Sequence, residues 1–419
     1  MKSKALFILT VAAGAGACGE STPNTGFQPT PASGTGTSSG AGGGSTGATG
    51  SGGASGSGSS SVASTTGASG GVGGATSAGG TGGSGTGGGA VSAGGAGGSG
   101  GSTVYTPEPS AGCGVAATQA LEEYVRYTFT PSEVAAACNL SPEAACEAAA
   151  NVNVAQDGEG NARTEREYFV RLPTGYDPNK PYRLIHVAMG CFDQTETKAY
   201  PMHEVDSGEA IYVTMQYVGT PADPCFDDMI PDSPDFPLVE AIQQRLDETV
   251  CFDRKRVFFG GYSSGSWLAN SVACLFGGDA GFIRGIGAYT GGLNPFVGGG
   301  TFPCQPGPTA GIFVHDRLDM ENVPAGGLAA CGLRLQSNAC AEPGVVCDVP
   351  GDDPTAMIAP GDPYVIEGLA QGAPEHECKL ITGCGPENPV VWCWTSDVEH
   401  SDSADALIIP TFWQFFSGL

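Results

Sequence analysis

Positive charge is scarce in this 419-residue chain, and it has no long apolar run. Lys and Arg number 17 against 43 Asp and Glu, which gives a formal net charge of −26. A surface this acidic repels phosphate groups, so the composition argues against a nucleic-acid partner and against anionic lipid surfaces. No uninterrupted apolar segment reaches the roughly 18 residues that a bilayer requires, so the sequence predicts no membrane-spanning helix.

Histidine is also rare, and metal-binding motifs are missing. The chain has five His, and its 15 Cys include no CxxC pair. No group of His and Cys residues has a recognised ligand spacing. The sequence therefore predicts no metal site, and nothing in it indicates a cofactor.

The N-terminal part of the chain has the composition of a targeting segment and a linker. Residues 1–18 join a basic start, a short apolar segment and small residues that end at Cys18. This pattern is typical of a lipoprotein signal peptide, in which Cys18 is lipidated, and an ordinary secretory signal is the alternative. Residues 19–103 are almost entirely Gly, Ser, Thr and Ala, and such a segment buries too little apolar surface to fold. We therefore predict a disordered linker there.

The cysteines indicate export. Without Cys18, 14 remain, an even number, and all of them lie within residues 104–419. So many cysteines without metal motifs favour disulfide bonds in an oxidising compartment, although the sequence does not give their pairing. We expect a protein at the outer cell surface or in the periplasm, held to the membrane only through an N-terminal lipid, or a secreted protein.

Residues 104–419 alternate between strand and helix patterns. This alternation predicts an α/β domain with a mostly parallel sheet and helices on both faces. The predicted strands are 167–172, 183–188, 210–216, 256–259, 283–288, 311–315 and 390–394. The predicted helices are 116–127, 236–250, 264–276 and 408–416, with two short helices, capped by Ser132 and Ser141, that run through Cys138 and Asn151.

A candidate nucleophile lies between a predicted strand and a predicted helix. Gly261-Tyr262-Ser263-Ser264-Gly265 fits the pattern G-x-S-x-G. Residues 43–47 fit it equally well, but they lie in the linker without a flanking strand or helix. A sharp turn between strand and helix exposes the serine hydroxyl, and the N–H of the next residue, Ser264, can face a developing oxyanion. A Gly-rich turn with a surface serine is the alternative interpretation.

A serine nucleophile needs a histidine base and an acid, which follow it in the order serine, acid, histidine. His400 comes directly after the last predicted strand, and His376, in a Cys-rich loop before that strand, is the rival. Asp316 and Asp319 both follow the strand at 311–315, and either can be the acid. The N–H of Cys191, after the strand at 183–188, is the candidate for a second oxyanion donor.

Several blocks of residues 104–419 are similar to the feruloyl esterase and polyhydroxybutyrate depolymerase-like group of secreted α/β-hydrolases, which are carbohydrate esterases. The blocks are 110–114, 166–173, 250–254 with the Ser263 turn, 315–319 and 383–400. His315 to Asp319 resembles a family motif whose last Asp is the catalytic acid, so the resemblance favours Asp319. It implies an α/β-hydrolase fold with a Ser263, Asp319 and His400 triad.

The chain departs from the family pattern in four places. Met189-Gly190, His315-Asp316 and Gly265-Ser266 replace the usual His-Gly, His-Gly and Gly-Gly pairs. Residues 115–162 resemble a helical, Cys-bearing insertion that either covers the site or packs elsewhere. None of these departures removes a triad residue, so they bear on the substrate rather than on the class of reaction.

The resemblance implies a serine esterase that acts on polymeric or polysaccharide-linked esters. Feruloyl esters of plant cell-wall polysaccharide come first, and polyesters or acetylated xylan are the alternatives. An inactive hydrolase fold that serves as a surface binding protein is the non-enzymatic alternative. Four aromatic residues flank the site in sequence and are candidates to stack on a phenolic acyl group, with core packing as the other possibility: Tyr262, Trp267, Trp392 and Trp394.

Overall fold

The computed structural model describes the region that was expected to fold, with gaps. The described residues are 105–151, 165–191, 199–217, 225–226, 232–293, 307–340, 347, 361–369, 373–396, 398–401 and 404–419. All of them belong to one compact unit, Gly97–Leu419. The predictions for the signal peptide, Cys18 and the linker, and the last part of the predicted insertion at 152–162, lie outside the described residues.

In the described part of the chain, ten strands form one sheet, in the order β1-β2-β4-β3-β5-β6-β7-β10-β9-β8. Their bounds are β1 Tyr124–Phe129, β2 Arg166–Arg171, β3 Tyr182–Ala188, β4 Ala210–Met215, β5 Phe252–Tyr262, β6 Gly285–Tyr289, β7 Ala310–Asp316, β8 Gly361–Pro363, β9 His376–Ile381 and β10 Val390–Thr395. The six strands from β4 to β10 in this order pair in parallel. β1, β2, β9 and β8 pair antiparallel at the two flanks.

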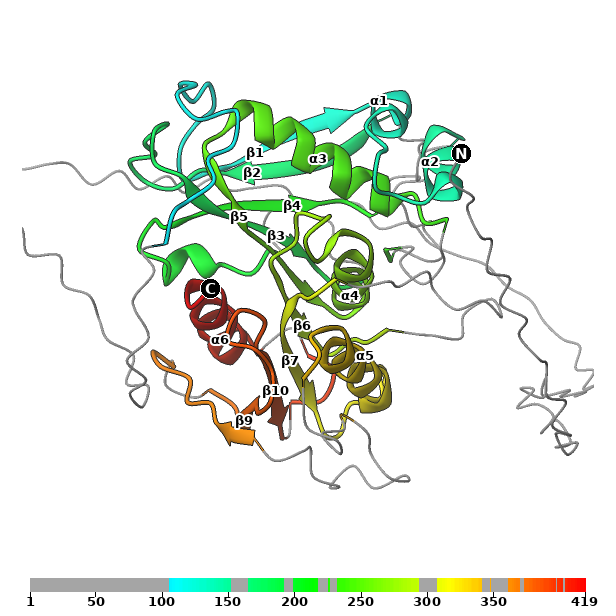
Figure 1. Cartoon of the computed structure of the whole chain (residues 1–419), viewed down its shortest axis with the longest axis vertical. Coiled ribbons are helices and arrows are strands. Elements are labelled where there is room, and N and C mark those ends of the chain that lie inside the picture. Colours follow the sequence, from blue (N-terminus) through cyan, green and yellow to red (C-terminus); the bar gives the residue numbers. More distant parts are fainter. Residues whose placement is uncertain are drawn as a thin grey trace, which may run out of the picture. The chain divides into compact units, whose positions relative to one another are not determined.

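Helices cover both faces of the sheet. The helices are α1 Pro131–Ala136, α2 Glu143–Asn151, α3 Asp235–Thr249, α4 Ser264–Phe276, α5 Pro324–Ser337 and α6 Asp405–Ser417, with a short 3₁₀ helix, η2, at Met202–Glu204. α4 and α5 lie on one side of the sheet and α6 lies on the other (Figure 1). The buried side chains of α3, α4 and α5 belong to one apolar cluster and those of α6 to a second. This arrangement confirms the predicted α/β-hydrolase fold.

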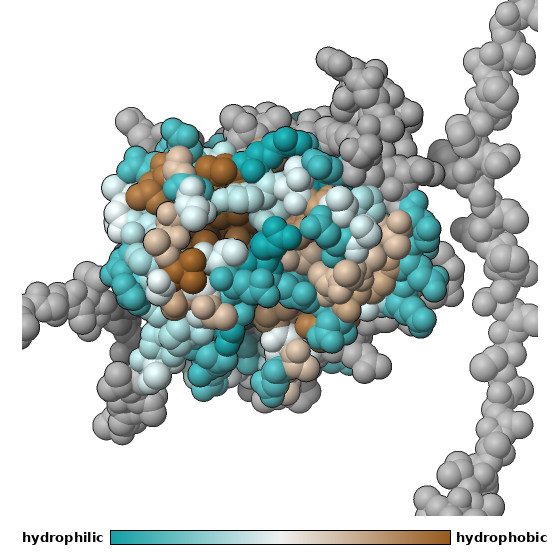
Figure 2. All heavy atoms as spheres, turned by 90° about the horizontal axis from the view of Figure 1, so that it is seen from above, coloured by the Kyte–Doolittle hydropathy of each residue, from teal (hydrophilic) through white to brown (hydrophobic). Residues whose placement is uncertain are grey.

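Most of the central strands are buried along nearly their whole length, as expected for strands covered on both faces. Every residue of β3 but one, and every residue of β4, β6, β7 and β10, is buried. Their continuous apolar runs are the reason that the sequence pattern found them. Hydrophilic residues cover much of the face shown in Figure 2, with smaller hydrophobic groups between them. No helix within the described part of the chain has the length and apolar character of a membrane span.

The predicted helix at 116–127 is wrong. Tyr124–Phe129 instead form β1, which pairs with β2 along its whole length. The apolar residues here satisfy helical spacing over a short window, but Tyr127 and Phe129 stack on Tyr168 across the strand pair. Such cross-strand aromatic contacts stabilise a sheet and override a weak local helix preference.

The described part of the predicted insertion packs at one flank of the sheet. α1 and α2 contact α3. The carboxylate of Glu240, on α3, accepts hydrogen bonds from the N–H groups of Asn139, Leu140 and Ser141 at 2.8, 2.7 and 3.0 Å. The N-cap of α1 is Thr130 rather than Ser132, because Thr130 and Glu133 form a capping box.

Six disulfide bonds join described cysteines, which confirms the predicted use of these residues. The pairs are Cys113–Cys251, Cys138–Cys146, Cys191–Cys225, Cys331–Cys347, Cys340–Cys384 and Cys378–Cys393. Cys274 is disulfide-bonded as well. Several of these bonds connect segments far apart in the sequence, which restricts the unfolded chain.

Candidate active site

Ser263 occupies a sharp turn between β5 and α4. Its φ is +51° and its ψ is −121°, a strained conformation for a residue with a side chain. The turn requires glycine on both sides. A Cβ at position 261 would lie 2.1 Å from the carbonyl oxygen of Gly265, and a Cβ at 265 would lie 2.0 Å from the carbonyl oxygen of Ala188. The two glycines therefore let the helix approach the strands closely enough to present Ser263.

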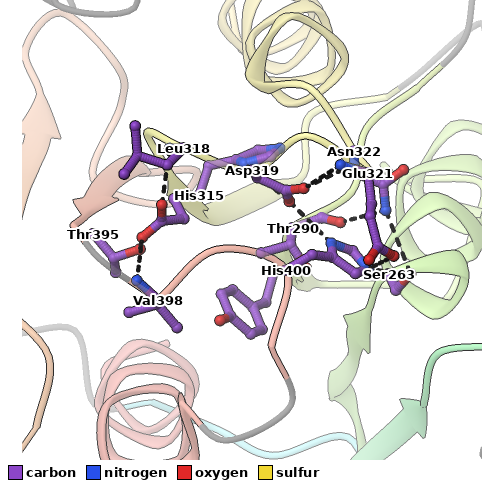
Figure 3. Close-up of polar contacts among 12 residues, drawn as sticks. Ser263, Thr290, His315, Leu318, Asp319, Glu321, Asn322, Thr395, Val398 and His400 are labelled. Atoms are coloured by element: carbon purple, nitrogen blue, oxygen red, sulfur yellow. Dashed lines mark hydrogen bonds and ion pairs between the residues drawn. The ribbon is translucent and has the colours of Figure 1, made fainter.

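The structure brings Ser263, His400 and Asp319 into one hydrogen-bonded chain (Figure 3). His400 Nε2 lies 2.9 Å from Ser263 Oγ, and His400 Nδ1 lies 3.0 Å from Asp319 Oδ2. The three residues come from the ends of β5, β7 and β10, which are parallel and therefore end at the same edge of the sheet. Ser263 and the His400 side chain are 8% and 9% exposed, whereas the Asp319 side chain is fully buried. Within this hydrogen-bonded series, Ser263 is nearest to solvent and the Asp319 carboxylate is the most deeply buried.

The Asp319 carboxylate is held in its charged form. Burial acts to raise its pKa, but hydrogen bonds from His400 and from the Asn322 N–H outweigh burial and leave the pKa below its usual value. The N–H groups of Glu321 and Asn322 donate to Oδ1 at 3.0 and 2.8 Å, so Oδ2 is left for His400. A charged Asp319 can orient the imidazole ring and stabilise its protonated form.

Asp316, the other candidate acid, binds a different set of groups. Its Oδ1 accepts from the Leu318 N–H at 2.8 Å, and its Oδ2 accepts from the Thr395 hydroxyl at 2.9 Å and the Val398 N–H at 3.0 Å. These bonds fasten the end of β10 to the end of β7, directly before the loop that carries His400. The carboxylate of Asp316 makes these bonds with Leu318, Thr395 and Val398 and not with the His400 ring.

His186, His315 and His376 make contacts with groups other than Ser263 Oγ. His186, on β3, lies within hydrogen-bond distance of Gln243, and burial lowers its pKa to about 4. His315 is buried beside Asp319, with 3.9 Å between Nδ1 and Oδ2, and burial lowers its pKa to about 4 as well. His376 is the first residue of β9, where its Nδ1 lies 2.9 Å from the Pro374 carbonyl oxygen.

The two predicted oxyanion donors lie on segments that meet at Ser263. Ser264 is the first residue of α4, and N–H groups in the first turn of a helix have no acceptor within that helix. Cys191 follows Gly190, where a Cβ would lie 3.2 Å from Ser263 Cβ, so the backbone directly before Cys191 lies against Ser263. A disulfide bond to Cys225 fixes the position of Cys191.

Tyr262 and Trp267, two of the four aromatic residues predicted to contact a substrate, lie close to His400 and to Asn322, respectively. The Tyr262 ring stacks on His400, with 5.3 Å between the ring centres. Trp267 donates from Nε1 to Asn322 Oδ1 at 3.2 Å. Trp392 and Trp394 are only 1% and 5% exposed and pack on each other in the core, so their environment favours packing over contact with a substrate.

The sequence analysis missed the residues that follow Asp319. The Asn322 side chain lies 3.3 Å from Ser263 Oγ, and Glu321 Oε2 lies 3.9 Å from His400 Nε2. Leu318, Met320 and Val323, on the same turn, expose 53%, 84% and 55% of their surface. The turn thus carries polar side chains close to Ser263 and His400 and, among them, apolar side chains with a large exposed surface. No motif marks these positions, although their closeness to a candidate acid was a signal that could have directed attention to them.

The described residues contain no group of three or more His, Cys, Asp or Glu side chains placed to hold a metal ion. A hydroxyl, an imidazole and a carboxylate in this order are suited to nucleophilic attack on a carbonyl group.

Comparison with known proteins connects this geometry to a group of enzymes. No family model matches the chain. Feruloyl esterase C of Emericella nidulans is 25% identical over 191 residues, which cover 42% of this chain and 63% of the relative. The chain has an α/β-hydrolase fold and is similar in sequence to feruloyl esterases. The resemblance noted from the sequence blocks is thereby confirmed.

Further relatives are similarly distant. Probable feruloyl esterase C of Aspergillus terreus is 26% identical over 183 residues, which cover 42% of this chain and 63% of the relative. The chain thus spans less than two thirds of the length of these relatives. Among solved structures, acetyl xylan esterase from Aspergillus awamori has a TM-score of 0.41 at 11% identity and covers 61% of this chain and 94% of its own. A ferulic acid esterase from Anaeromyces mucronatus has a TM-score of 0.41 at 13% identity, and the match covers 72% of this chain and 93% of the esterase.

Proposed function

We propose that this chain is an exported serine esterase that hydrolyses carboxylic esters, with feruloyl-type esters on plant cell-wall polysaccharide as its first candidate substrates. The observation that carries the proposal is the continuous hydrogen-bonded chain from Ser263 through His400 to the buried, charged Asp319. The sequence similarity to feruloyl esterases supports the same class of substrate. The disulfide bonds support an oxidising compartment.

The proposed reaction has two acyl-transfer steps. His400 Nε2 takes the Ser263 proton while Oγ attacks the ester carbonyl carbon, and the carbonyl oxygen becomes an oxyanion that the N–H groups of Ser264 and Cys191 stabilise. His400 then gives the proton to the leaving alcohol as the carbon–oxygen bond breaks. Water repeats the sequence on the acyl-enzyme and releases the acid. Asp319 holds the imidazole in one orientation throughout.

The rim of the site favours a substrate with an apolar acyl group. Leu318, Met320 and Val323 expose apolar side chains on the turn that carries Asp319 and Asn322. Apolar surface next to a nucleophile gains free energy when an acyl group covers it. Glu321, 76% exposed on the same turn, disfavours acyl groups that carry a negative charge.

The test is hydrolysis of methyl ferulate and of a short-chain nitrophenyl ester by the full-length protein and its Ser263→Ala variant. We expect cleavage of both esters, and a loss of about 10⁴-fold or more in kcat in the variant. Ser132→Ala is the matched control, because it removes an exposed serine hydroxyl on α1, at the flank of the sheet. Its activity should stay close to that of the wild type.

Other outcomes redirect or overturn the proposal. Cleavage of the short ester alone would keep the serine mechanism and move the substrate to acetylated xylan or a polyester. Undiminished activity in Ser263→Ala would refute the mechanism. If the folded wild-type protein cleaved neither ester, the esterase function would fail, and a surface binding protein with an inactive hydrolase fold would take its place.

A further inference from the structure

We propose that Asn322 is a further catalytic residue, whose side-chain amide donates a hydrogen bond to the reacting oxygen of Ser263. We infer that Trp267 is a positioning residue that fixes the orientation of this amide. Together they set the direction of every hydrogen bond from the indole to Asp319. The inference rests on the proposed esterase function and adds two residues to it.

The Asn322 amide lies at a junction of three groups. Its Nδ2 is 3.3 Å from Ser263 Oγ and 2.8 Å from the carbonyl oxygen of Thr290 (Figure 3). Its Oδ1 accepts a hydrogen bond from Trp267 Nε1 at 3.2 Å. All of the amide's polar atoms are thus engaged, and one of them touches the nucleophile.

The chemistry of these neighbours allows only one orientation of the amide. An indole N–H can only donate a hydrogen bond, and a carbonyl oxygen can only accept one. The oxygen of Asn322 must therefore face Trp267, and its NH₂ group must face Thr290. The second hydrogen of that NH₂ group is then directed to Ser263 Oγ.

This orientation determines the hydrogen bonds that follow along the chain. Ser263 Oγ accepts from Asn322, so its single proton is free to point at His400 Nε2. His400 then accepts at Nε2 and carries its proton at Nδ1, which donates to Asp319 Oδ2. The donor direction runs from Trp267 to Asp319 without a break. It is the direction in which the serine proton must move when Oγ attacks.

The amide also contributes during bond formation. As the Oγ–carbonyl bond forms, the serine proton moves to His400 Nε2 and the carbonyl electron pair moves to the oxyanion. Negative charge passes through Oγ in this step, and a hydrogen bond to that atom is strongest while the charge is present. The proton of Asn322 stays on its nitrogen throughout, so the step balances without another reactant.

Asn322 is held rigidly enough for this role. Its backbone N–H donates to Asp319 Oδ1 at 2.8 Å, which ties the amide to the triad carboxylate. Trp267 packs closely on the next helix, because a Cβ at Gly326 would lie 3.1 Å from the indole ring. Thr290 adopts a φ of +45°, and its N–H is bound by the Val314 carbonyl at 2.9 Å, which fixes the neighbouring carbonyl group.

Three variants test the inference on the full-length protein with the ester that the wild type cleaves. Asn322→Ala removes the donor, and we expect kcat to fall by about 10- to 100-fold with little change in KM. Asn322→Asp should lose more at neutral pH, because a carboxylate accepts the serine proton and draws it away from His400. Trp267→Phe keeps the ring and removes only its N–H, and should lower kcat by about 3- to 10-fold.

The pH profile separates this role from simple packing. In the Asn322→Asp variant, protonation of the introduced carboxylate restores an O–H donor, so its deficit relative to the wild type should shrink as the pH falls. The deficit of Asn322→Ala has no such cause and should stay constant. Asn151→Ala, at the exposed end of α2, is the control for replacement of an asparagine and should match the wild type.

The outcomes distinguish this inference from the proposed function. If the wild type is active and Ser263→Ala is not, but both Asn322 variants keep the wild-type kcat, the inference is wrong and the esterase function stands. If the wild type is inactive, or Ser263→Ala is as active as the wild type, the proposed function itself fails. Should the Asn322 variants unfold, Trp267→Phe decides, since an unchanged kcat in that folded variant would overturn the inference.

Discussion

The two ends of the turn after β7 carry the same chemical group in two different settings. Asp316 and Asp319 are both buried, and each accepts hydrogen bonds on both carboxylate oxygens. Asp316 binds a hydroxyl and two backbone N–H groups, whereas Asp319 binds two backbone N–H groups and an imidazole ring. One hydrogen-bond partner, His400, therefore distinguishes the proposed triad acid Asp319 from Asp316, which holds two strand ends together.

The position of each aspartate along the turn determines whether it binds a neighbouring strand or the His400 ring. Asp316 still belongs to β7, so its side chain meets the neighbouring strand β10 and Thr395. Asp319 lies three residues farther on, where the chain has left the sheet and reaches over its edge. His400 in turn comes from the loop that Asp316 fastens. The first carboxylate thus positions the histidine that the second one binds.

The largest expected effect comes from Asp319→Asn. Its amide would keep the size of the carboxylate but present an N–H to His400 Nδ1, which favours the wrong tautomer. We expect kcat for ester hydrolysis to fall by about 10³- to 10⁴-fold, with a small change in the unfolding midpoint. Steady-state kinetics and thermal unfolding of the same preparation measure both. A kcat within a few-fold of the wild type would remove Asp319 from the mechanism.

Asp316→Ala should have the opposite effect to Asp319→Asn, with a large loss of stability and a smaller loss of activity. The substitution leaves the buried Thr395 hydroxyl and Val398 N–H without their acceptor, and we expect a loss of about 2–4 kcal/mol in the free energy of unfolding. Urea denaturation measures it. Activity should fall less than in Asp319→Asn, because the triad itself is complete. Equal losses of stability in the two variants would contradict the division of roles proposed for the turn.

A smaller effect concerns His186, which is buried on β3. The folded protein keeps His186 neutral down to a pKa of about 4, whereas an unfolded histidine takes up a proton near pH 6.5. Between these values only the unfolded chain binds the proton, so stability falls as the pH is lowered. The slope from one such histidine is about 1.4 kcal/mol per pH unit.

The variant His186→Gln tests this expectation. It should make the free energy of unfolding less dependent on pH between about 6.5 and 4. Urea denaturation at several pH values gives the slopes. Parallel curves for the wild type and His186→Gln would show that His186 is protonated in the fold.

The sequence was most informative where burial is continuous. The strands from β3 to β10 that pair in parallel, the glycines around Ser263 and the helix α4 all leave strong local patterns, and the predicted bounds of α4 match the structure. The order serine, acid, histidine that is typical of the family directed the choice of the acid and of His400.

Other elements leave weaker local signals. α5 contains three glycines, so its helix propensity is low and its packing on β7 and β10 stabilises it. β1 is rich in β-branched and aromatic residues that favour a strand, and its pairing with β2 outweighs the helical spacing of the apolar residues before it. Asn322 belongs to no motif, and only the folded turn brings it to Ser263. Tertiary contact, rather than local preference, decides each of these cases.

The Cys191–Cys225 bond has a practical consequence for making the protein. It fixes the loop whose N–H group is assigned to the oxyanion, so a correct triad alone does not complete the site. Chain synthesised in a reducing cytosol would contain Ser263, His400 and Asp319 but lack the cross-link that places this loop. On the proposed mechanism, the route of production, through oxidative folding or without it, sets the specific activity of a preparation whose sequence is unchanged.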